Sequence, residues 1–259
     1  MEQHSPSIRA YAVALMRQGI PNRVVAEQLG IPRGTISWWR CEDRKARGEV
    51  YRQPTDCPVC TDRELDQTAY SYLLGLYLGD GHIVSKHKQR HLSIFCNAAQ
   101  TGLVAAAEDA MRRVMSTPSI GRHRKTGCIE VKSYTGHWTC VFPQHGPGRK
   151  HERRIVLEPW QQAVVDARPW EFVRGLIHSD GCRITNWTAR VVAGERKRYE
   201  YPRYFFTNKS DDIRALYTGT LDRLGVEWTA CARDGDPFNI SVARRASVAL
   251  MDLHVGPKH

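Results

Sequence analysis

Two aspartates, Asp80 and Asp180, are the residues of this chain whose type and spacing point most directly to chemistry. Each stands near the end of a ten-residue block that occurs twice. The first copy, residues 72–81, reads YLLGLYLGDG, and the second copy, residues 172–181, reads FVRGLIHSDG. The apolar residues before each aspartate predict a buried helix that ends at the aspartate, because a helix that is apolar on nearly all sides belongs in an interior.

A carboxylate at the C-terminal end of a helix is unfavourable by about 0.3–1 kcal/mol, because the helix dipole is negative there. Small residues recur at intervals of four before both aspartates and predict that the two helices pack closely. These are Gly75, Gly79, Gly175 and Ser179. Close packing would bring Asp80 near Asp180, and two neighbouring anions repel each other. A divalent cation bound by both carboxylates would remove both penalties, so the pattern predicts a metal site.

The chain after each block shows the same order of expected elements, beginning with a left-handed helix terminus at Gly81 and at Gly181. In the first half we expect strands near residues 91–95, 129–132 and 138–142, and helices near residues 103–115 and 157–166. In the second half we expect strands near residues 183–192, 201–206, 228–233 and 238–242, and helices near residues 212–224 and 246–253. The sequence therefore predicts an α+β fold of two pseudo-symmetric halves, each with the order αββαββα.

The first forty residues predict a small helical unit. Helices are expected over residues 7–17, 23–29 and 33–41. Asn22 is suited to cap the second of them. Ala26, Gly30 and Ile36 have the spacing of a helix-turn-helix, with a small residue where the helices touch, a glycine in the turn and an aliphatic residue in the core. The segment resembles the helix-turn-helix of bacterial regulators and recombinases.

In such a unit the third helix enters the major groove of DNA, where its outward side chains contact phosphates and base edges. The residues to which we assign this role are Arg33, Thr35, Ser37 and Arg40. The alternative is a three-helix unit that binds another protein or caps a larger domain.

These patterns divide the chain into three parts. Residues 1–45 form the expected helix-turn-helix domain. Residues 46–67 are polar and contain Pro54 and Pro58, which is typical of a linker. Residues 68–259 contain the two halves, about 68–168 and 169–259.

Charge and hydropathy favour a nucleic-acid partner. The 259 residues include 38 Lys and Arg against 27 Asp and Glu, for a net charge of +11 and an isoelectric point near 9.4. This excess indicates a polyanionic partner, DNA first, with a basic solubilising surface as the alternative. We find neither a run apolar enough for a membrane span nor a signal peptide, so we expect a cytoplasmic, nucleoid-associated protein with no membrane partner.

The repeated blocks resemble the motif of the LAGLIDADG homing endonuclease family, in its two-motif single-chain form, over residues 68–259. The resemblance implies that the two motif helices form the interface between the halves and that β-strands form a saddle along double-stranded DNA. It implies that Asp80 and Asp180, with the adjacent Gly81 and Gly181, bind Mg²⁺ or Mn²⁺. The implied activity is hydrolysis of both DNA strands at a specific site by a monomer with internal pseudo-two-fold symmetry.

One position departs from the family motif. Leu78 and His178 occupy the place of an earlier acid, which does not bind metal in the family. We therefore expect little consequence for the metal site, and we expect His178 to be a packed histidine.

A second repeat supports the pairing of the halves. Residues 145–151, HGPGRKH, are echoed by residues 254–259, HVGPKH. The resemblance implies one basic residue per half near the metal, and Lys150 and Lys258 are the candidates for stabilising charge on the phosphate. The alternative is a turn that contacts phosphate without a catalytic role. Arg149 and Arg153 are expected to contact the DNA backbone.

Two other functions are compatible with these residues. The first is a transcription regulator that retains the LAGLIDADG scaffold without cleaving DNA, and the N-terminal helix-turn-helix favours it. The second is an RNA maturase, against which the helix-turn-helix counts. Retention of both Asp80 and Asp180 favours the endonuclease.

The eight cysteines contain a single pair with metal-ligand spacing, Cys57 and Cys60. A structural zinc ion normally needs four ligands. Cys41, or a histidine such as His82, is a candidate to complete the site, although no spacing requires either residue. The alternative is a plain turn that carries two thiols.

Overall fold

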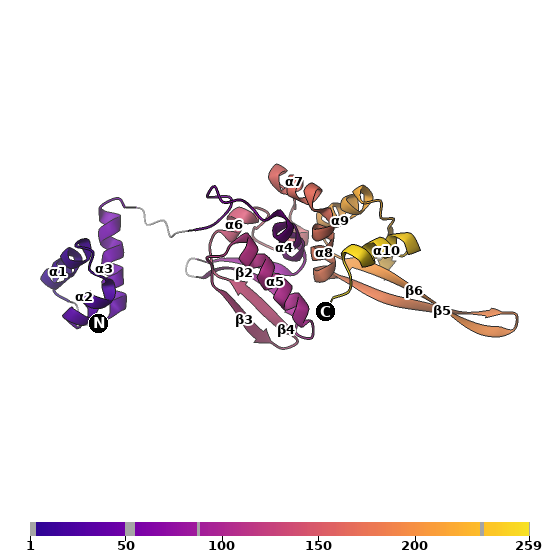
Figure 1. Cartoon of the computed structure of the whole chain (residues 1–259), viewed down its shortest axis with the longest axis horizontal. Coiled ribbons are helices and arrows are strands. Elements are labelled where there is room, and N and C mark those ends of the chain that lie inside the picture. The colour runs from indigo at the N-terminus through magenta and orange to yellow at the C-terminus, as the bar shows by residue number, and fades with distance from the viewer. Residues whose placement is uncertain (1–3, 50–54, 87–88, 234–235, 259) are drawn as a thin grey trace. The chain divides into compact units, whose positions relative to one another are not determined.

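The computed structural model describes residues 4–49, 55–86, 89–233 and 236–258. The chain forms two compact units, Met1–Thr55 and Asp56–His259 (Figure 1). Among the described residues we find no helix with the length and apolar character needed to cross a membrane.

The first unit contains three helices: α1 (Pro6–Arg17), α2 (Asn22–Leu29) and α3 (Arg33–Ala46). α2 ends at Gly30, which adopts a left-handed conformation with φ of 64°, and the Ile31 N–H then donates to the Ala26 carbonyl at 3.1 Å. The expected tight turn between α2 and α3 is therefore confirmed. The core of the unit consists of Ala12, Met16, Val25, Ile31, Ile36 and Trp39.

The sequence predicted that Asn22 caps α2, and this prediction is wrong. Pro21 stands at the cap position without a side-chain hydrogen bond, and Asn22 is the first helical residue. The Asn22 side chain bonds instead to Ser37 and Arg40 on α3. The polar side chain is thus used to join two helices.

The second unit confirms the α+β fold and the αββαββα order of each half. The first half contains α4 (Gln67–Asp80), β1 (Gly81–Lys86), β2 (Gln89–Asn97), α5 (Thr101–Val114), β3 (Ile120–Lys125), β4 (Cys128–Ser133) and α6 (Trp138–Val141). A 3₁₀ turn (Lys150–Glu152) and α7 (Pro159–Ala167) lead to the second half. That half contains α8 (Pro169–Asp180), β5 (Gly181–Val192), β6 (Glu195–Thr207), α9 (Asp211–Arg223), β7 (Thr229–Arg233), β8 (Asp236–Val242) and α10 (Arg245–His254).

Each half builds one antiparallel four-stranded sheet, and the strand orders β1-β2-β4-β3 and β5-β6-β8-β7 are equivalent. The register is also equivalent, because Gly81 faces Ile94 and Gly181 faces Phe206. The hairpin β5–β6 is longer than its counterpart β1–β2. Its outer part extends beyond the sheet as a two-stranded ribbon (Figure 1).

Helices α4 and α8 pack against each other in the middle of the second unit. A Cβ atom added to Gly75 would lie 2.6 Å from the Phe172 carbonyl oxygen and 2.7 Å from the Leu176 nitrogen. The two backbones are therefore in direct contact, which confirms the close packing predicted from the small residues. Asp66 caps the start of α4 by accepting a hydrogen bond of 2.9 Å from the Ala69 N–H.

The sequence predicted that the glycines after the two aspartates are left-handed helix termini, and this prediction is wrong. Gly81 has φ of −86° and Gly181 has φ of −109°, and each begins a strand. Space requires glycine there, because a Cβ atom on Gly81 would lie 2.5 Å from the Tyr77 Cα. On Gly181 it would lie 2.8 Å from the Ile177 Cα. Each helix therefore runs directly into a strand without a turn between them.

Residues 138–142, expected as a strand, form the one-turn helix α6 and its C-cap. The His137 carbonyl accepts hydrogen bonds from the Cys140 and Val141 N–H groups. Trp138, Val141 and Phe142 are buried together against α4, and the rings of Phe142 and Tyr77 stack at 4.3 Å. The β-branched and aromatic residues that favoured a strand are thus used to pack a helical turn.

Candidate active site

The two repeated aspartates lie together at the paired ends of α4 and α8. A Cβ atom on Gly79, one residue before Asp80, would lie 3.1 Å from the Asp180 carboxyl carbon. Burial raises the pKa of Asp80 above its ordinary value. Burial, and next the negative charge of Asp80, raise the pKa of Asp180 to about 6. The two carboxylates therefore form a coupled, half-buried pair.

Each half directs one lysine to the end of its own motif helix. Lys150 Nζ donates to the carbonyls of Leu78 at 3.1 Å and Gly79 at 2.9 Å, and also to that of Tyr77. Burial lowers the pKa of Lys150 to about 8, against the opposing charges of the two aspartates. Lys258 Nζ donates to the Ser179 carbonyl at 2.7 Å, and burial lowers its pKa too.

Sequence analysis missed Asn208. Its side chain donates a hydrogen bond of 2.6 Å to the Asp180 carboxylate. The matching position of the first half is Cys96. Cys96 stands two residues after Ile94, which pairs with Gly81, and Asn208 stands two residues after Phe206, which pairs with Gly181. Burial and the nearby Asp80 raise the pKa of Cys96 to about 12. No sequence pattern marks Asn208, because the position that matches it in the first half is a cysteine.

An open cleft of about 480 Å³ lies over this centre and is lined by both halves. The first half contributes Lys150 and His145, and the second contributes Asp180 and Asn208. The pKa of His145 is lowered by burial and by the positive charge of Arg153, so the ring favours its neutral form. The cleft thus presents carboxylate, ammonium and amide groups to one volume.

The two arginines assigned to DNA contact have different surroundings. Arg149 is exposed and lies 3.9 Å from Glu152. Arg153 Nη1 donates to the carbonyls of Gly146 at 2.7 Å and Gly148 at 2.9 Å. Arg153 therefore shapes the loop that carries Lys150, and Arg149 presents its charge to solvent.

His178 packs inside the helix pair, as expected. Its Nδ1 atom lies 2.9 Å from the Tyr72 hydroxyl, and the two rings meet edge to face at 5.7 Å. The contact joins α8 to α4. His178 thus contributes to the interface between the halves.

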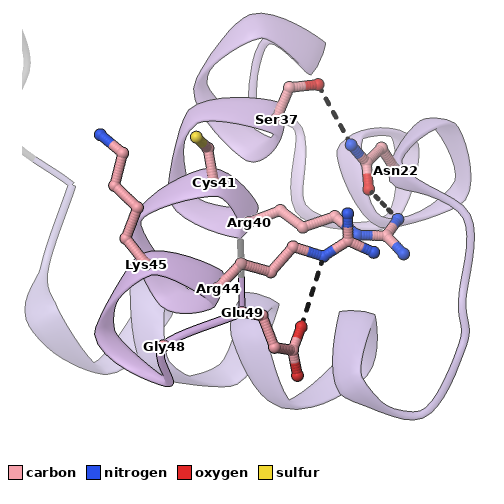
Figure 2. Close-up of a pocket in the computed structure, with 8 residues that line it drawn as sticks. All are labelled: Asn22, Ser37, Arg40, Cys41, Arg44, Lys45, Gly48 and Glu49. Atoms are coloured by element: carbon pink, nitrogen blue, oxygen red, sulfur yellow. Dashed lines mark hydrogen bonds and ion pairs between the residues drawn. The ribbon is translucent and has the colours of Figure 1, made fainter. Parts of the chain in front are cut away.

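The residues assigned to DNA recognition in the first unit all lie on α3. Arg33 and Ser37 are exposed, and Thr35 and Arg40 are half-buried. Arg40, Arg44 and Lys45 line an open pocket of about 830 Å³, which Figure 2 shows. Arg40 donates a hydrogen bond of 2.8 Å to Oδ1 of the Asn22 side chain, and Nδ2 of Asn22 donates in turn to the Ser37 hydroxyl at 3.1 Å. The pocket is basic, with Glu49 as its acidic residue.

Cys57 and Cys60 lie beside His137 and Cys140. Of the two completing residues named from the sequence, Cys41 belongs to the first unit and His82 lines the cleft beside Lys150. The sequence analysis missed His137 and Cys140. These two residues are separated by two others, as Cys57 and Cys60 are, with a histidine in place of the first cysteine.

The donor set at the paired helix ends fits a hard divalent cation. Carboxylate oxygens are the ligands that Mg²⁺ prefers. Although Lys150 and Lys258 stabilise the anions, the pKa values of both Asp80 and Asp180 remain raised, burial being the first cause. Additional positive charge would stabilise this pair.

No model of a known protein family matches the chain. No curated protein matches it either. Solved structures similar to this one include I-DmoI in complex with DNA and Mn, which is 11% identical with a TM-score of 0.47 and matches over 74% of this chain and 98% of that one. Mesophilic variants of the homing endonuclease I-DmoI are 12% identical, with a TM-score of 0.45 over 73% and 96% of the chains. The N-terminal LAGLIDADG domain of DUF199/WhiA is 11% identical, with a TM-score of 0.47 over 79% and 88%.

Proposed function

We propose that the second unit is a divalent-metal-dependent endonuclease that hydrolyses both strands of a specific DNA site. The observation that carries the proposal is the coupled pair Asp80 and Asp180, one from each half, at the ends of helices in backbone contact. Because one chain supplies both carboxylates, the protein acts as a monomer, with each half serving one strand.

Asp80 and Asp180 are the residues that would hold the metal, with the main-chain carbonyls of Gly81 and Gly181 as further ligands. When bound, Mg²⁺ or Mn²⁺ supplies positive charge to the phosphate and activates water for hydrolysis. Lys150 and Lys258 add fixed positive charge beside the carboxylates, which attracts phosphate and stabilises charge that develops on it. Asn208 is a positioning residue, because it fixes the orientation of the Asp180 carboxylate.

The first test is cleavage of a duplex selected from a randomised DNA library. We expect wild-type protein to cut both strands with Mg²⁺ or Mn²⁺ and to bind without cutting in Ca²⁺. Lys258→Ala should slow cutting by about 10²–10³-fold if the lysine stabilises transition-state charge. Specific binding without cleavage in either Mg²⁺ or Mn²⁺ would overturn the endonuclease.

We also propose that the three-helix unit is a helix-turn-helix that reads DNA through Arg33, Thr35, Ser37 and Arg40, while Arg149 of the second unit contacts the backbone. Arg33 is exposed and is suited to the first test, since its replacement disturbs no core residue. Arg33→Ala should reduce the salt dependence of DNA binding by about one unit of slope. Arg23→Ala, on exposed α2, is the matched control.

One observation favours the alternative, a regulator that does not cleave. Lys150 and Lys258 already bond the carbonyls at the ends of α4 and α8, so the acids have cationic neighbours within the protein. A regulator would bind its site equally well in EDTA and in Mg²⁺, and would leave the DNA intact. The endonuclease requires metal for cleavage.

A further inference from the structure

Four potential metal ligands meet on the first half of the second unit, away from the paired aspartates. The Cys/His cluster consists of Cys57, Cys60, His137 and Cys140. Its sulfur and ring-nitrogen atoms all lie within 4.8 Å of one another. Two come from a turn near the start of the unit, and two come from the N-cap residue of α6, His137, and from α6 itself, Cys140, so the cluster joins segments that are distant in the sequence.

The three separations among Cys60, His137 and Cys140 are close to those of a tetrahedral metal site. With zinc–sulfur bonds of about 2.3 Å and zinc–nitrogen bonds of about 2.0–2.1 Å, ligand atoms lie about 3.8 Å apart for two sulfurs and about 3.5 Å for sulfur and nitrogen. Cys60 Sγ lies 3.6 Å from Cys140 Sγ and 3.5 Å from His137 Nδ1. Cys140 Sγ lies 3.8 Å from the same nitrogen. A disulfide would require the sulfurs to approach to about 2.05 Å.

The local backbone also suits metal ligation. Residues 57–60 form a turn in which the Cys60 and Thr61 N–H groups donate to the Cys57 carbonyl at 3.1 Å. Cys57 is fully buried, while Cys60 is exposed and leaves a path for an ion to enter.

We propose that the Cys/His cluster binds one structural zinc ion, which fastens the start of the second unit to α6. Three thiolates and one imidazole form a soft ligand set that selects zinc over magnesium. All four positions are filled by protein, as in structural rather than catalytic zinc sites. The proposal is independent of DNA cleavage.

The position of α6 gives the ion a structural role. A single helical turn is not stable by its own hydrogen bonds, because helix nucleation is unfavourable. The C-terminal end of α6 is fixed by the Tyr70 hydroxyl, which donates to the Val141 carbonyl at 2.9 Å. The zinc would hold the same turn through His137, its N-cap residue, and through Cys140. Phe142, directly after α6, stacks on Tyr77 of α4, so the ion supports the helix that ends in Asp80.

The first experiment measures the metal content of the full chain, purified without chelator, by elemental analysis and native mass spectrometry. We expect about one zinc ion per chain. Cobalt(II) added to the metal-free protein should give the absorption of a tetrahedral thiolate complex. Absence of tightly bound zinc together with absence of this cobalt spectrum would overturn the proposal, as would a mass showing a Cys60–Cys140 disulfide in reduced, zinc-supplemented protein.

Variants then locate the ion. Cys60→Ser and Cys140→Ser should each lose zinc in competition with a chromophoric chelator, whereas His137→Cys should retain it, because four cysteines also form a zinc site. Cys231→Ser is the matched control, a half-buried cysteine on β7 outside the cluster. Full zinc content in both serine variants would place the ion elsewhere and sink the proposal.

Chelation gives a readout that separates this site from the paired aspartates. Removal of zinc should lower the melting temperature by on the order of 10 °C, because the ion binds only the folded chain. Asp80→Asn should leave the zinc content unchanged even if it abolishes cleavage. An unchanged melting temperature after complete zinc removal would contradict the structural role.

Discussion

The two halves of the second unit share strand order, register and the charged ends of their motif helices, and they differ in how each end is supported. In the first half, Lys150 bonds three carbonyls at the end of α4, and Cys96 stands near Asp80. In the second half, Lys258 bonds one carbonyl, and Asn208 bonds Asp180. The charged centre is thus duplicated while its supports have diverged.

The halves also differ in the helix that follows the last strand of each half, which is α6 after β4 and α10 after β8. α10 has 10 residues, whereas α6 has 4, and α6 with its N-cap residue supplies two members of the Cys/His cluster, His137 and Cys140. The longer helix forms more hydrogen bonds of its own and is stabilised mainly by packing of buried residues such as Val248 and Met251. Under the zinc proposal, the bound ion would do for α6 in the first half what greater length and buried residues do for α10 in the second.

The largest expected effect tests the duplicated centre. Asp80→Asn and Asp180→Asn should each abolish double-strand cleavage while site binding is retained, because asparagine preserves shape but removes the charge that holds a hard cation. A gel-shift assay in Ca²⁺ and a cleavage assay in Mg²⁺ on one selected duplex measure the two properties. If either variant cuts both strands at the wild-type rate, the halves are not equivalent parts of one active site.

The next effect tests the divergence between Asn208 and Cys96. Asn208→Ala removes a hydrogen bond to a charged group, worth about 1.5–3 kcal/mol, and should slow cleavage of one strand by about 10–100-fold. Supercoiled plasmid carrying the site should then accumulate as the nicked form. Cys96→Ser is the matched control and should leave both strands cut at similar rates. Equal slowing of both strands by Asn208→Ala would show that the two carboxylates act as one unit.

A third effect concerns stability without metal. The pKa of Asp180 is about 6 in the folded chain, against 3.8 for the ordinary group, with burial as the first cause and Asp80 as the second. The folded state therefore binds more protons than the unfolded state between about pH 4 and pH 6, and stability from this group falls as pH rises through that range. Asp180→Asn should recover at most about 3 kcal/mol at pH 7.

The measurement for this prediction is urea unfolding in EDTA at pH 4 and pH 7, with wild type, Asp180→Asn and Asp80→Asn compared. Asp80→Asn should stabilise in the same direction, because the pKa of Asp80 is also raised. Loss of stability at pH 7 in both variants would mean that the pairing of the carboxylates with Lys150 and Lys258 outweighs their burial.

The sequence predicted the parts of this centre that depend on local residue pattern. The repeated apolar blocks with small residues four apart predicted two closely packed helices, and the structure confirms them. Residues brought in by sheet register or by distant loops were missed, because no local pattern marks them. Asn208 reaches Asp180 only through the pairing of β5 with β6, and His137 reaches Cys60 only after α6 packs on α4.

Conformation was also mispredicted where packing overrides propensity. Gly81 was expected to be left-handed because glycine often ends a helix in that conformation. The position instead requires glycine because a Cβ atom there would collide with Tyr77. Trp138 begins a helical turn within a segment rich in strand-forming residues, since its indole N–H donates to the Ser133 carbonyl and its ring is buried. Such tertiary contacts are invisible to residue preference.

The smallest expected effect is on the free energy of unfolding, and it compares Lys150 and Lys258 as caps of α4 and α8. Lys150→Met keeps an unbranched chain of similar length but removes one donor from three carbonyls of α4, of which that of Tyr77 keeps the Gly81 N–H, and should cost about 2–3 kcal/mol of unfolding free energy. Lys258→Met removes a donor from one carbonyl of α8 and should cost about 1 kcal/mol. Urea unfolding in EDTA at pH 7 measures both, and exposed Lys209→Met on the cleft wall is the control. Equal costs would mean that the number of carbonyls bound by each lysine does not set its contribution, and that the two halves are supported alike despite their different contacts.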